Sequence, residues 1–111
     1  MGLTMNFQAT NTALAGGTAL VVLPEALNAL PITAVVVLSS GATARLYASC
    51  ADHSLLMSDP DSVSFVEVDE AILTESMTFS ITTPVSALKV EAIGSNVTLE
   101  VRTFDTSVDI K

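Results

Sequence analysis

The sequence is poor in cysteine, in aromatic residues and in positive charge. Its single cysteine, Cys50, cannot form a disulfide within the chain, so the fold has to rely on packing. Lysine and arginine number four against twelve aspartates and glutamates, which gives a formal net charge of −8. Nucleic acids and anionic membranes are therefore not expected as partners, because both are bound through clustered basic residues.

Long hydrophobic runs are also missing. The most apolar region, residues 13–38, is interrupted by two glycines, two prolines, a glutamate and an asparagine. It therefore lacks the roughly 18 continuous apolar residues that a membrane-spanning helix needs. Residues 1–14 contain no lysine or arginine, which does not fit the charged-then-apolar order of a secretory signal. We expect neither export nor membrane insertion.

Charged residues make up only 14% of the chain, against about 25% in soluble domains, while half of the residues are apolar. A domain this small has much surface to cover with polar groups. Either its many serines and threonines provide that cover, or contacts with other subunits do. We expect the second, and hence a homo-oligomer or a larger assembly.

Alternation of apolar and polar residues predicts short β-strands along the whole chain. The expected strands are residues 5–9, 18–23, 32–38, 43–49, 62–68, 77–82, 85–93 and 96–104. Residues 32–38 are almost continuously apolar and β-branched, which predicts a strand buried on both faces that pairs with 43–49 as a hairpin. Between Pro24 and Pro31 the chain can form a short helix or a loop.

A second hairpin is predicted near the C-terminus, with Gly94 and Ser95 as its two-residue turn. Counting outward from this turn gives three apolar cross-strand pairs on one face: Ala92 with Val97, Val90 with Leu99, and Leu88 with Val101. Glu91 and Glu100 fall on the opposite face. A shift of one residue would destroy this agreement, which favours the register.

Together these elements predict one all-β domain over residues 1–111. Its fold class would be an antiparallel β-sandwich or a small, jelly-roll-like barrel, with or without one short helix. Residues 1–11 have two interpretations. They form either an extended arm that docks on a neighbouring subunit or an ordinary core strand.

Cys50, Asp52 and His53 are the first candidates for a nucleophile or a metal site. A structural zinc site needs four ligands, and this chain has one cysteine and one histidine. Asp59 and Asp61, with Asp52 upstream, could offer oxygen ligands to calcium, but the glycine and glutamate spacing of an EF-hand is missing. Ordinary turns explain these residues better, and we expect no metal site.

Glu67, Asp69, Glu70 and Glu75 form an acidic cluster of the kind that glycoside hydrolysis uses in pairs. With no tryptophan and one tyrosine to line a sugar cleft, a solvated face is the better interpretation. The sequon at residues 96–98 has meaning only in a secreted eukaryotic protein. We therefore expect no catalytic, cofactor or metal residues, and a protein that is not an enzyme.

The segment TPVSALKVEAIGSNVTLEVR, residues 83–102, resembles the closing hairpin of small β-sandwich virion proteins of tailed bacteriophages. The resemblance implies a structural protein of the virion, made in the host cytoplasm, of the capsid decoration or cement type. Its partners would be the major capsid protein or other virion subunits, and such proteins are often trimers. A carbohydrate- or protein-binding module on a phage tail, fibre or cell surface is the alternative.

Overall fold

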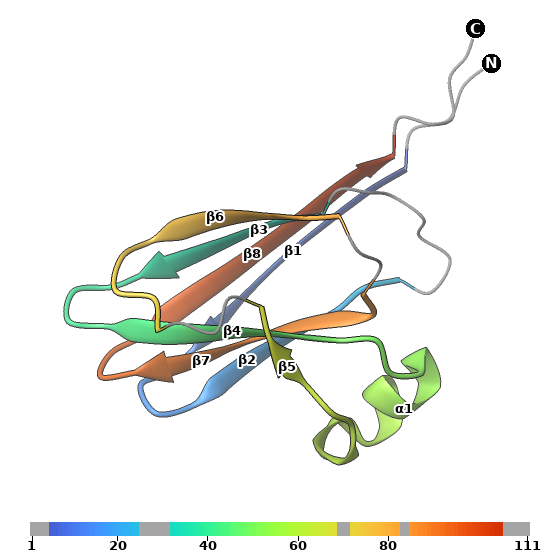
Figure 1. Cartoon of the computed structure of the whole chain (residues 1–111), viewed down its shortest axis with the longest axis horizontal. Coiled ribbons are helices and arrows are strands. Elements are labelled where there is room, and N and C mark those ends of the chain that lie inside the picture. Colours follow the sequence, from blue (N-terminus) through green and yellow to red (C-terminus); the bar gives the residue numbers. More distant parts are fainter. Residues whose placement is uncertain (1–4, 25–31, 69–71, 83–84, 106–111) are drawn as a thin grey trace, which may run out of the picture.

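The computed structural model describes residues 5–24, 32–68, 72–82 and 85–105, which form two four-stranded antiparallel sheets packed face to face (Figure 1). Sheet A contains, in spatial order, β1 (Met5–Ala13), β8 (Val97–Asp105), β3 (Ile32–Leu38) and β6 (Met77–Ile81). Sheet B contains β2 (Thr18–Val22), β7 (Ala87–Ile93), β4 (Thr43–Ser49) and β5 (Val66–Glu67). The short helix α1 (His53–Ser58) and the 3-10 turn η1 (Pro60–Ser62) connect β4 to β5.

The predicted fold class is confirmed. The order β1-β8-β3-β6 in one sheet and β2-β7-β4-β5 in the other is that of an eight-stranded jelly roll. Along the chain, each connection between consecutive strands crosses from one sheet to the other, except the one that carries α1. Across the sandwich, β1 contacts β2, β3 contacts β4, and β7 contacts β8.

The core lies between the sheets and follows from the alternation of side chains along each strand. Leu88, Val90 and Ala92 of β7 and Val97, Leu99 and Val101 of β8 are each at most 1% exposed. Ile32, Ala34 and Val36 of β3 and Leu46 of β4 complete the centre of the cluster. The polar residues between them point outward, which is the pattern of a strand with one buried face.

Both predicted hairpins are wrong. β7 pairs with β2 and β4, β8 pairs with β1 and β3, and β3 and β4 belong to different sheets. The residues predicted to face inward are buried. They pack against one another across the core, however, and do not pair as neighbours within one sheet. The alternation of apolar and polar residues shows which face of a strand is buried. This alternation is the same whether the next strand turns back within the sheet or crosses to the other sheet. The segment with the phage resemblance thus contains two strands of different sheets and the turn that crosses between them.

The prediction that β3 is buried on both faces is also wrong. Its inward residues are buried, but Val35 is only partly buried and Val37 is 39% exposed. A strand in a two-layer sandwich has one face on the core and one face outside. The outward valines of β3 therefore add apolar surface to the molecule.

Other elements differ in extent from the prediction. The strand expected at residues 62–68 is reduced to Val66–Glu67, while β1 continues to Ala13. The helix lies at His53–Ser58, whereas the predicted helix or loop after Pro24 falls outside the described residues. Residues 5–11, part of the segment interpreted as an arm or a strand, belong to β1. In the described part of the chain, no helix is long and apolar enough to cross a membrane.

A pair of cysteine substitutions distinguishes the observed strand pairing from the predicted hairpin. Thr12 and Thr98 are opposite one another in β1 and β8, with their hydroxyls 3.1 Å apart. In a Cys50→Ser background, Thr12→Cys combined with Thr98→Cys should form an intrachain disulfide on mild oxidation, because such neighbours are within bonding reach. Non-reducing peptide mapping would detect it.

The matched control is Glu91→Cys combined with Thr98→Cys. These two positions are opposite one another in the predicted hairpin but lie on the outer faces of different sheets in the structure. This control should stay reduced under the same conditions. An efficient disulfide between positions 91 and 98 would overturn the sandwich topology in favour of the hairpin.

Candidate functional site

Four connections meet at one end of the sandwich, on the left in Figure 1, and we call this surface the turn end. They are residues 14–17 between β1 and β2, 39–42 between β3 and β4, 72–76 before β6, and 94–96 between β7 and β8. Glu75 is the only charged residue in these four segments. Glycine, serine and alanine supply most of the rest, so the turn end is compact and almost uncharged.

Asn96 ties three of these connections together. Its side-chain Oδ1 accepts a hydrogen bond from the backbone N–H of Ala15 at 3.1 Å. Its backbone carbonyl accepts one from the Ser39 hydroxyl at 2.6 Å and another from the Ser39 N–H at 3.2 Å. The fourth connection is attached through Ser76, whose hydroxyl accepts the Leu38 N–H at 2.9 Å. The turn end is therefore held by hydrogen bonds between segments distant in sequence.

Gly94 brings two of the connections into close contact. Its φ of +85° lies in the left-handed region that favours glycine. A Cβ atom at this position would lie 2.9 Å from the carbonyl oxygen of Gly41, closer than side chains normally approach. Only glycine satisfies both conditions, and the β7–β8 turn can consequently rest directly on the β3–β4 turn.

Large apolar side chains are exposed in and beside these connections, with Val37 on the outer face of sheet A and Ile93 on the outer face of sheet B. Among the described residues, five of the eight large hydrophobic side chains that are exposed lie in these connections or within two residues of them: Leu14, Val37, Ile72, Met77 and Ile93. Leu14 is the most exposed of the five, at 67%. Apolar side chains that gather on a surface with little charge are typical of protein interaction sites. The composition predicts subunit contacts, but no local sequence pattern identifies these residues.

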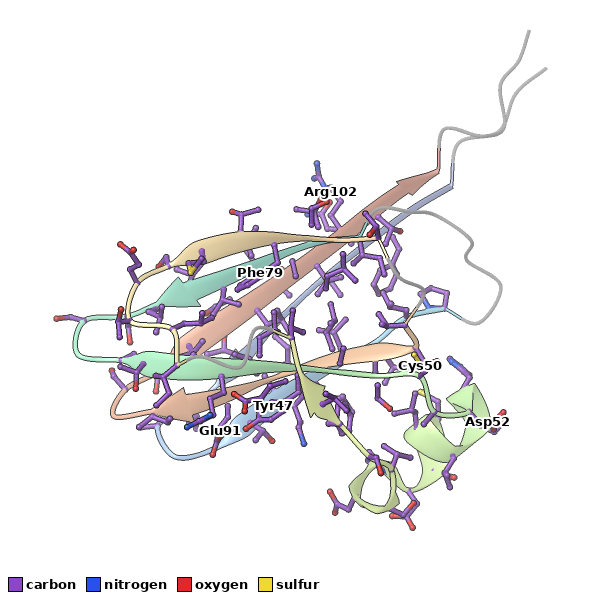
Figure 2. The ribbon with its side chains drawn as sticks, in the orientation of Figure 1. Tyr47, Cys50, Asp52, Phe79, Glu91 and Arg102 are labelled. Carbon is purple, nitrogen blue, oxygen red and sulfur yellow. The ribbon has the colours of Figure 1, made fainter. Side chains whose placement is uncertain are left out.

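A second candidate site lies on the outer face of sheet B, where a hollow of ≈ 320 Å³ is lined by Thr18, Tyr47, Val63, Phe65, Lys89 and Glu91. The Tyr47 hydroxyl donates a hydrogen bond to Glu91 Oε1 at 3.0 Å (Figure 2). Lys89 Nζ lies 4.1 Å from the centre of the Phe65 ring and 5.5 Å from that of Tyr47. Cation–π attraction thus holds the ammonium between two rings.

An ion pair borders this hollow. Arg45 of β4 donates a hydrogen bond to Glu67 of β5 at 2.8 Å, and this contact raises the pKa of Arg45 further above its ordinary value. Because both side chains are partly exposed, the pair contributes little to stability. Its geometric effect is to fix the two-residue strand β5 at the edge of sheet B.

Burial raises the pKa of Tyr47, and the hydrogen bond to Glu91 and the charge of that carboxylate raise it further. The phenol is therefore held in its protonated form, as a hydrogen-bond donor. The hollow offers two rings, an ammonium and a carboxylate, a set that suits a small polar ligand such as a sugar. These groups also contact one another, and in doing so they hold residues 63–67 against sheet B.

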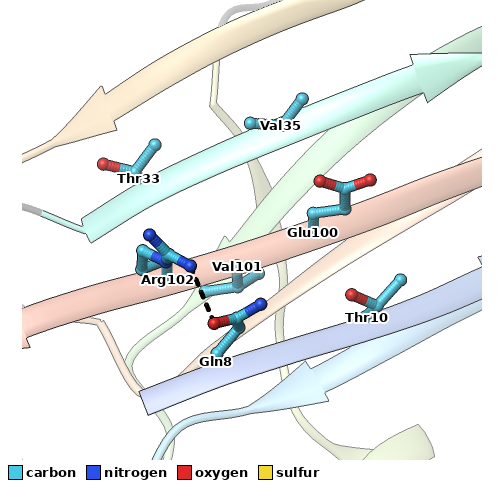
Figure 3. A pocket seen from close by; sticks show the side chains of 7 residues that line it. All are labelled: Gln8, Thr10, Thr33, Val35, Glu100, Val101 and Arg102. Atoms are coloured by element: carbon cyan, nitrogen blue, oxygen red, sulfur yellow. Dashed lines mark hydrogen bonds between the residues drawn. The ribbon is translucent and has the colours of Figure 1, made fainter. Parts of the chain in front are cut away.

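A second hollow, of ≈ 260 Å³, lies on the outer face of sheet A between β1, β8 and β3 (Figure 3). Arg102 crosses its floor and donates a hydrogen bond to Gln8 Oε1 at 2.9 Å. Thr10, Thr33, Val35 and Glu100 surround it. No aromatic ring is among its lining residues, so this hollow is less suited to a ligand than the one on sheet B.

The residues considered as a possible nucleophile or as metal ligands lie in and beside the short helix α1. Asp52 is the N-cap of α1, and its carboxylate accepts hydrogen bonds from the N–H groups of Ser54 and Leu55 at 3.1 and 3.4 Å. His53 begins the helix, and Cys50 is exposed just after β4. In residues 5–24, 32–68, 72–82 and 85–105, no group of three or more histidine, cysteine, aspartate or glutamate side chains could hold a metal ion.

The acidic candidates are not brought together. Asp59 lies at the boundary of α1 and η1, and Asp61 lies within η1. Glu67 is paired with Arg45, while Glu75 is at the turn end. Asp69 and Glu70 lie outside the described residues. Asn96, which sequence analysis treated as part of a chance sequon, is instead the residue on which the turn end depends.

Comparison with protein-family models, with curated proteins and with solved structures finds no match to this chain. The function proposed below therefore rests on the surfaces described here and on the resemblance of residues 83–102. Of these surfaces, the turn end has the most exposed large apolar side chains among the described residues.

Chelation tests whether a metal contributes to the fold. We expect EDTA to leave the melting temperature unchanged, because Asp52 acts as a helix cap and no metal-binding group exists among the described residues. Differential scanning fluorimetry with and without chelator measures this. A fall of several degrees that calcium reverses would contradict it, since a bound ion stabilises only the folded state.

The single tyrosine makes the contact between Tyr47 and Glu91 on sheet B directly observable. Titration at 295 nm should give the folded protein a tyrosine pKa above the ordinary value of about 10, and that value should return in guanidinium chloride. Since the folded-state pKa is raised, the stability contributed by Tyr47 is fully present below about pH 10 and is lost as the pH rises through the folded-state value.

Glu91→Gln is the matched variant for this titration. It removes the negative charge that opposes ionisation but leaves the burial of Tyr47, so the pKa should fall partway toward its ordinary value. A folded protein with an unshifted tyrosine pKa, or a Glu91→Gln variant that titrates like the wild type, would contradict the geometry of the cluster.

Proposed function

We propose that this chain is a structural protein of a tailed-phage particle, of the capsid decoration type, that binds other virion subunits through its turn end. The observation that carries the proposal is the exposure of five large apolar side chains in or beside connections that contain one charged residue. The core of the domain is complete without them. Their burial therefore becomes favourable only when a partner covers them.

The rigidity of the turn end supports this proposal. Hydrogen bonds centred on Asn96 and the close approach of Gly94 to Gly41 hold the connections in place before any partner binds. A preorganised surface loses less conformational entropy on association, so more of its apolar contact contributes to affinity. A protein that binds only the assembled lattice then stabilises that lattice by mass action.

The architecture and the charge are compatible with this role. Jelly rolls occur in viral capsid proteins and also in lectins, so the fold alone does not separate the two functions. The net charge of −8 favours a partner surface with positive charge around an apolar centre, as the junctions of a major capsid protein would have to provide. The resemblance of residues 83–102 adds the phage particle as the setting.

The hollow on sheet B favours a second candidate function, a carbohydrate-binding module on a phage tail, fibre or cell surface. Tyr47 and Phe65 supply rings, while Lys89 and Glu91 supply hydrogen-bonding groups around ≈ 320 Å³ of space. A sugar would have to displace Lys89 from the Phe65 ring, 4.1 Å away, before it could stack there. Because losing this contact would weaken sugar binding, we favour the turn end as the binding surface.

A capsid-binding experiment tests the proposal. The chain is mixed with particles assembled from the major capsid protein of the same phage, and bound protein is measured by co-sedimentation. We expect the wild type to bind and to raise the temperature at which the particles disassemble. Leu14→Asp should lose at least tenfold in affinity while its own melting temperature stays the same, since Leu14 is 67% exposed.

Met57→Asp is the matched control, because Met57 is 64% exposed but lies on α1, away from the turn end. It should bind like the wild type. Equal loss of binding in both variants would contradict the turn end as the docking surface. A wild-type protein that ignores capsids but binds a glycan array, with binding lost in Tyr47→Ala, would favour the carbohydrate-binding alternative.

A further inference from the structure

The free edge of sheet A has the properties of a pairing surface. β1 is the outermost strand on its side of the sheet, and β8 is the only strand that pairs with it among the described residues. It contains nine residues, compared with five in each of the edge strands β6 and β2 and two in β5. It is therefore the longest edge that the sandwich presents.

Nothing in β1 protects this edge. Natural edge strands are usually shortened, bulged, or interrupted by lysine or proline, which prevents pairing with another chain. The sequence of β1, MNFQATNTA, has no charged residue, no proline and no glycine. Its register with β8 runs one residue to one residue from Met5 to Ala13 without a bulge. In a chain with a net charge of −8, a nine-residue edge without an acidic residue is a place where two copies can meet without direct repulsion.

One side-chain contact shows which residues of β1 direct their backbone N–H and C=O groups away from β8, toward the free edge. The backbone N–H of Thr12 donates to the side chain of Asn11 at 3.0 Å, so it does not belong to the ladder with β8. In an antiparallel strand the N–H and C=O of alternate residues point to the same side. The backbone groups of Gln8 and Thr10 therefore also point away from β8. The side-chain amide of Asn11 itself donates a hydrogen bond to the backbone oxygen of Leu20 at 3.0 Å. The part of the edge that can pair with another strand therefore ends at Thr10.

We propose that two copies of this chain associate through the free edges of their β1 strands, antiparallel about a two-fold axis at Gln8. This centre places residue 6 opposite residue 10 of the second copy and Gln8 opposite its own equivalent. Each of the three resulting pairs exchanges two backbone hydrogen bonds. The product is one continuous eight-stranded sheet made of two four-stranded ones, closed by an isologous interface.

Charge placement is compatible with this pairing. The nearest acidic side chain on the same face with a described position is Glu100, on β8, opposite Thr10 and one strand away from the edge. Across the two-fold axis, the two β8 strands are separated by three strand spacings, roughly 14 Å. That exceeds the Debye length of about 8 Å at physiological salt, so the two glutamates repel one another only weakly. The interface concerns self-association and is independent of whether the turn end binds a capsid.

Proline substitution tests the edge. Thr10→Pro removes an outward N–H without breaking the ladder to β8, and proline is tolerated on free edges. In sedimentation equilibrium at about 100 µM, the wild type should have the mass of a dimer, and Thr10→Pro should be a monomer with a melting temperature within a few degrees of wild type. Ala9→Pro is the control, since its N–H faces β8 and its loss should lower the melting temperature sharply.

Cross-linking gives a second measurement that does not depend on proline. In a Cys50→Ser background, Gln8→Cys should form a disulfide between two copies, because opposed residues across a two-fold axis are about 5.5 Å apart. Glu100→Cys, equally outward but one strand inside, should not.

A wild type that stays monomeric, a trimer of the kind that the phage resemblance implies, or a Thr10→Pro dimer as stable as the wild type would each overturn the proposal. So would equal cross-linking of the two cysteine variants. A monomeric wild type whose capsid binding is weakened by Thr10→Pro would show instead that the edge pairs with a strand of another protein.

Discussion

The packing of β7 against β8 across the core is the contact on which the rest of the molecule depends. Both are inner strands of their sheets, and their inward residues, from Leu88 to Val101, are almost completely buried. Each also pairs with two strands of its own sheet, so β7, β8 and their four partners make up six of the eight strands. Once β7 and β8 pack against one another, the opposite face of each sheet lies on the surface of the molecule.

Local alternation explains why the strands could be predicted and their partners could not. The bounds of β3 and β4 match the prediction residue for residue, because β-branched runs and turn residues determine where a strand begins and ends. The pairing of β7 with β8 was wrong for a different reason. A short connection at Gly94 serves equally for an in-plane hairpin and for a crossing between sheets, and only the presence of β1 and β3 beside β8 decides between them.

The candidate surfaces were harder to predict than the fold. Leu14, Ile72 and Ile93 are far apart in sequence, and they come together only because the jelly roll brings its turns to one end. Asn96 has no local signal for its role, since the groups it binds belong to other connections. The sheet B cluster likewise joins Arg45 and Glu67 across a helix and a turn. By contrast, the cap at Asp52 is local, and the residue type alone is typical of that position.

Pairing of β1 with β8 has a consequence for synthesis of the protein. β1 leaves the ribosome before its partner β8, which ends at residue 105, so sheet A cannot close until 92 further residues have followed Ala13. At translation rates of about 5 to 20 residues per second, β1 waits roughly 5 to 20 s for its ladder. During this time an uncharged nine-residue strand is exposed on both sides, next to the nascent chains of neighbouring ribosomes. The spacing of ribosomes along the messenger RNA thus affects the fraction of this protein that reaches its native state.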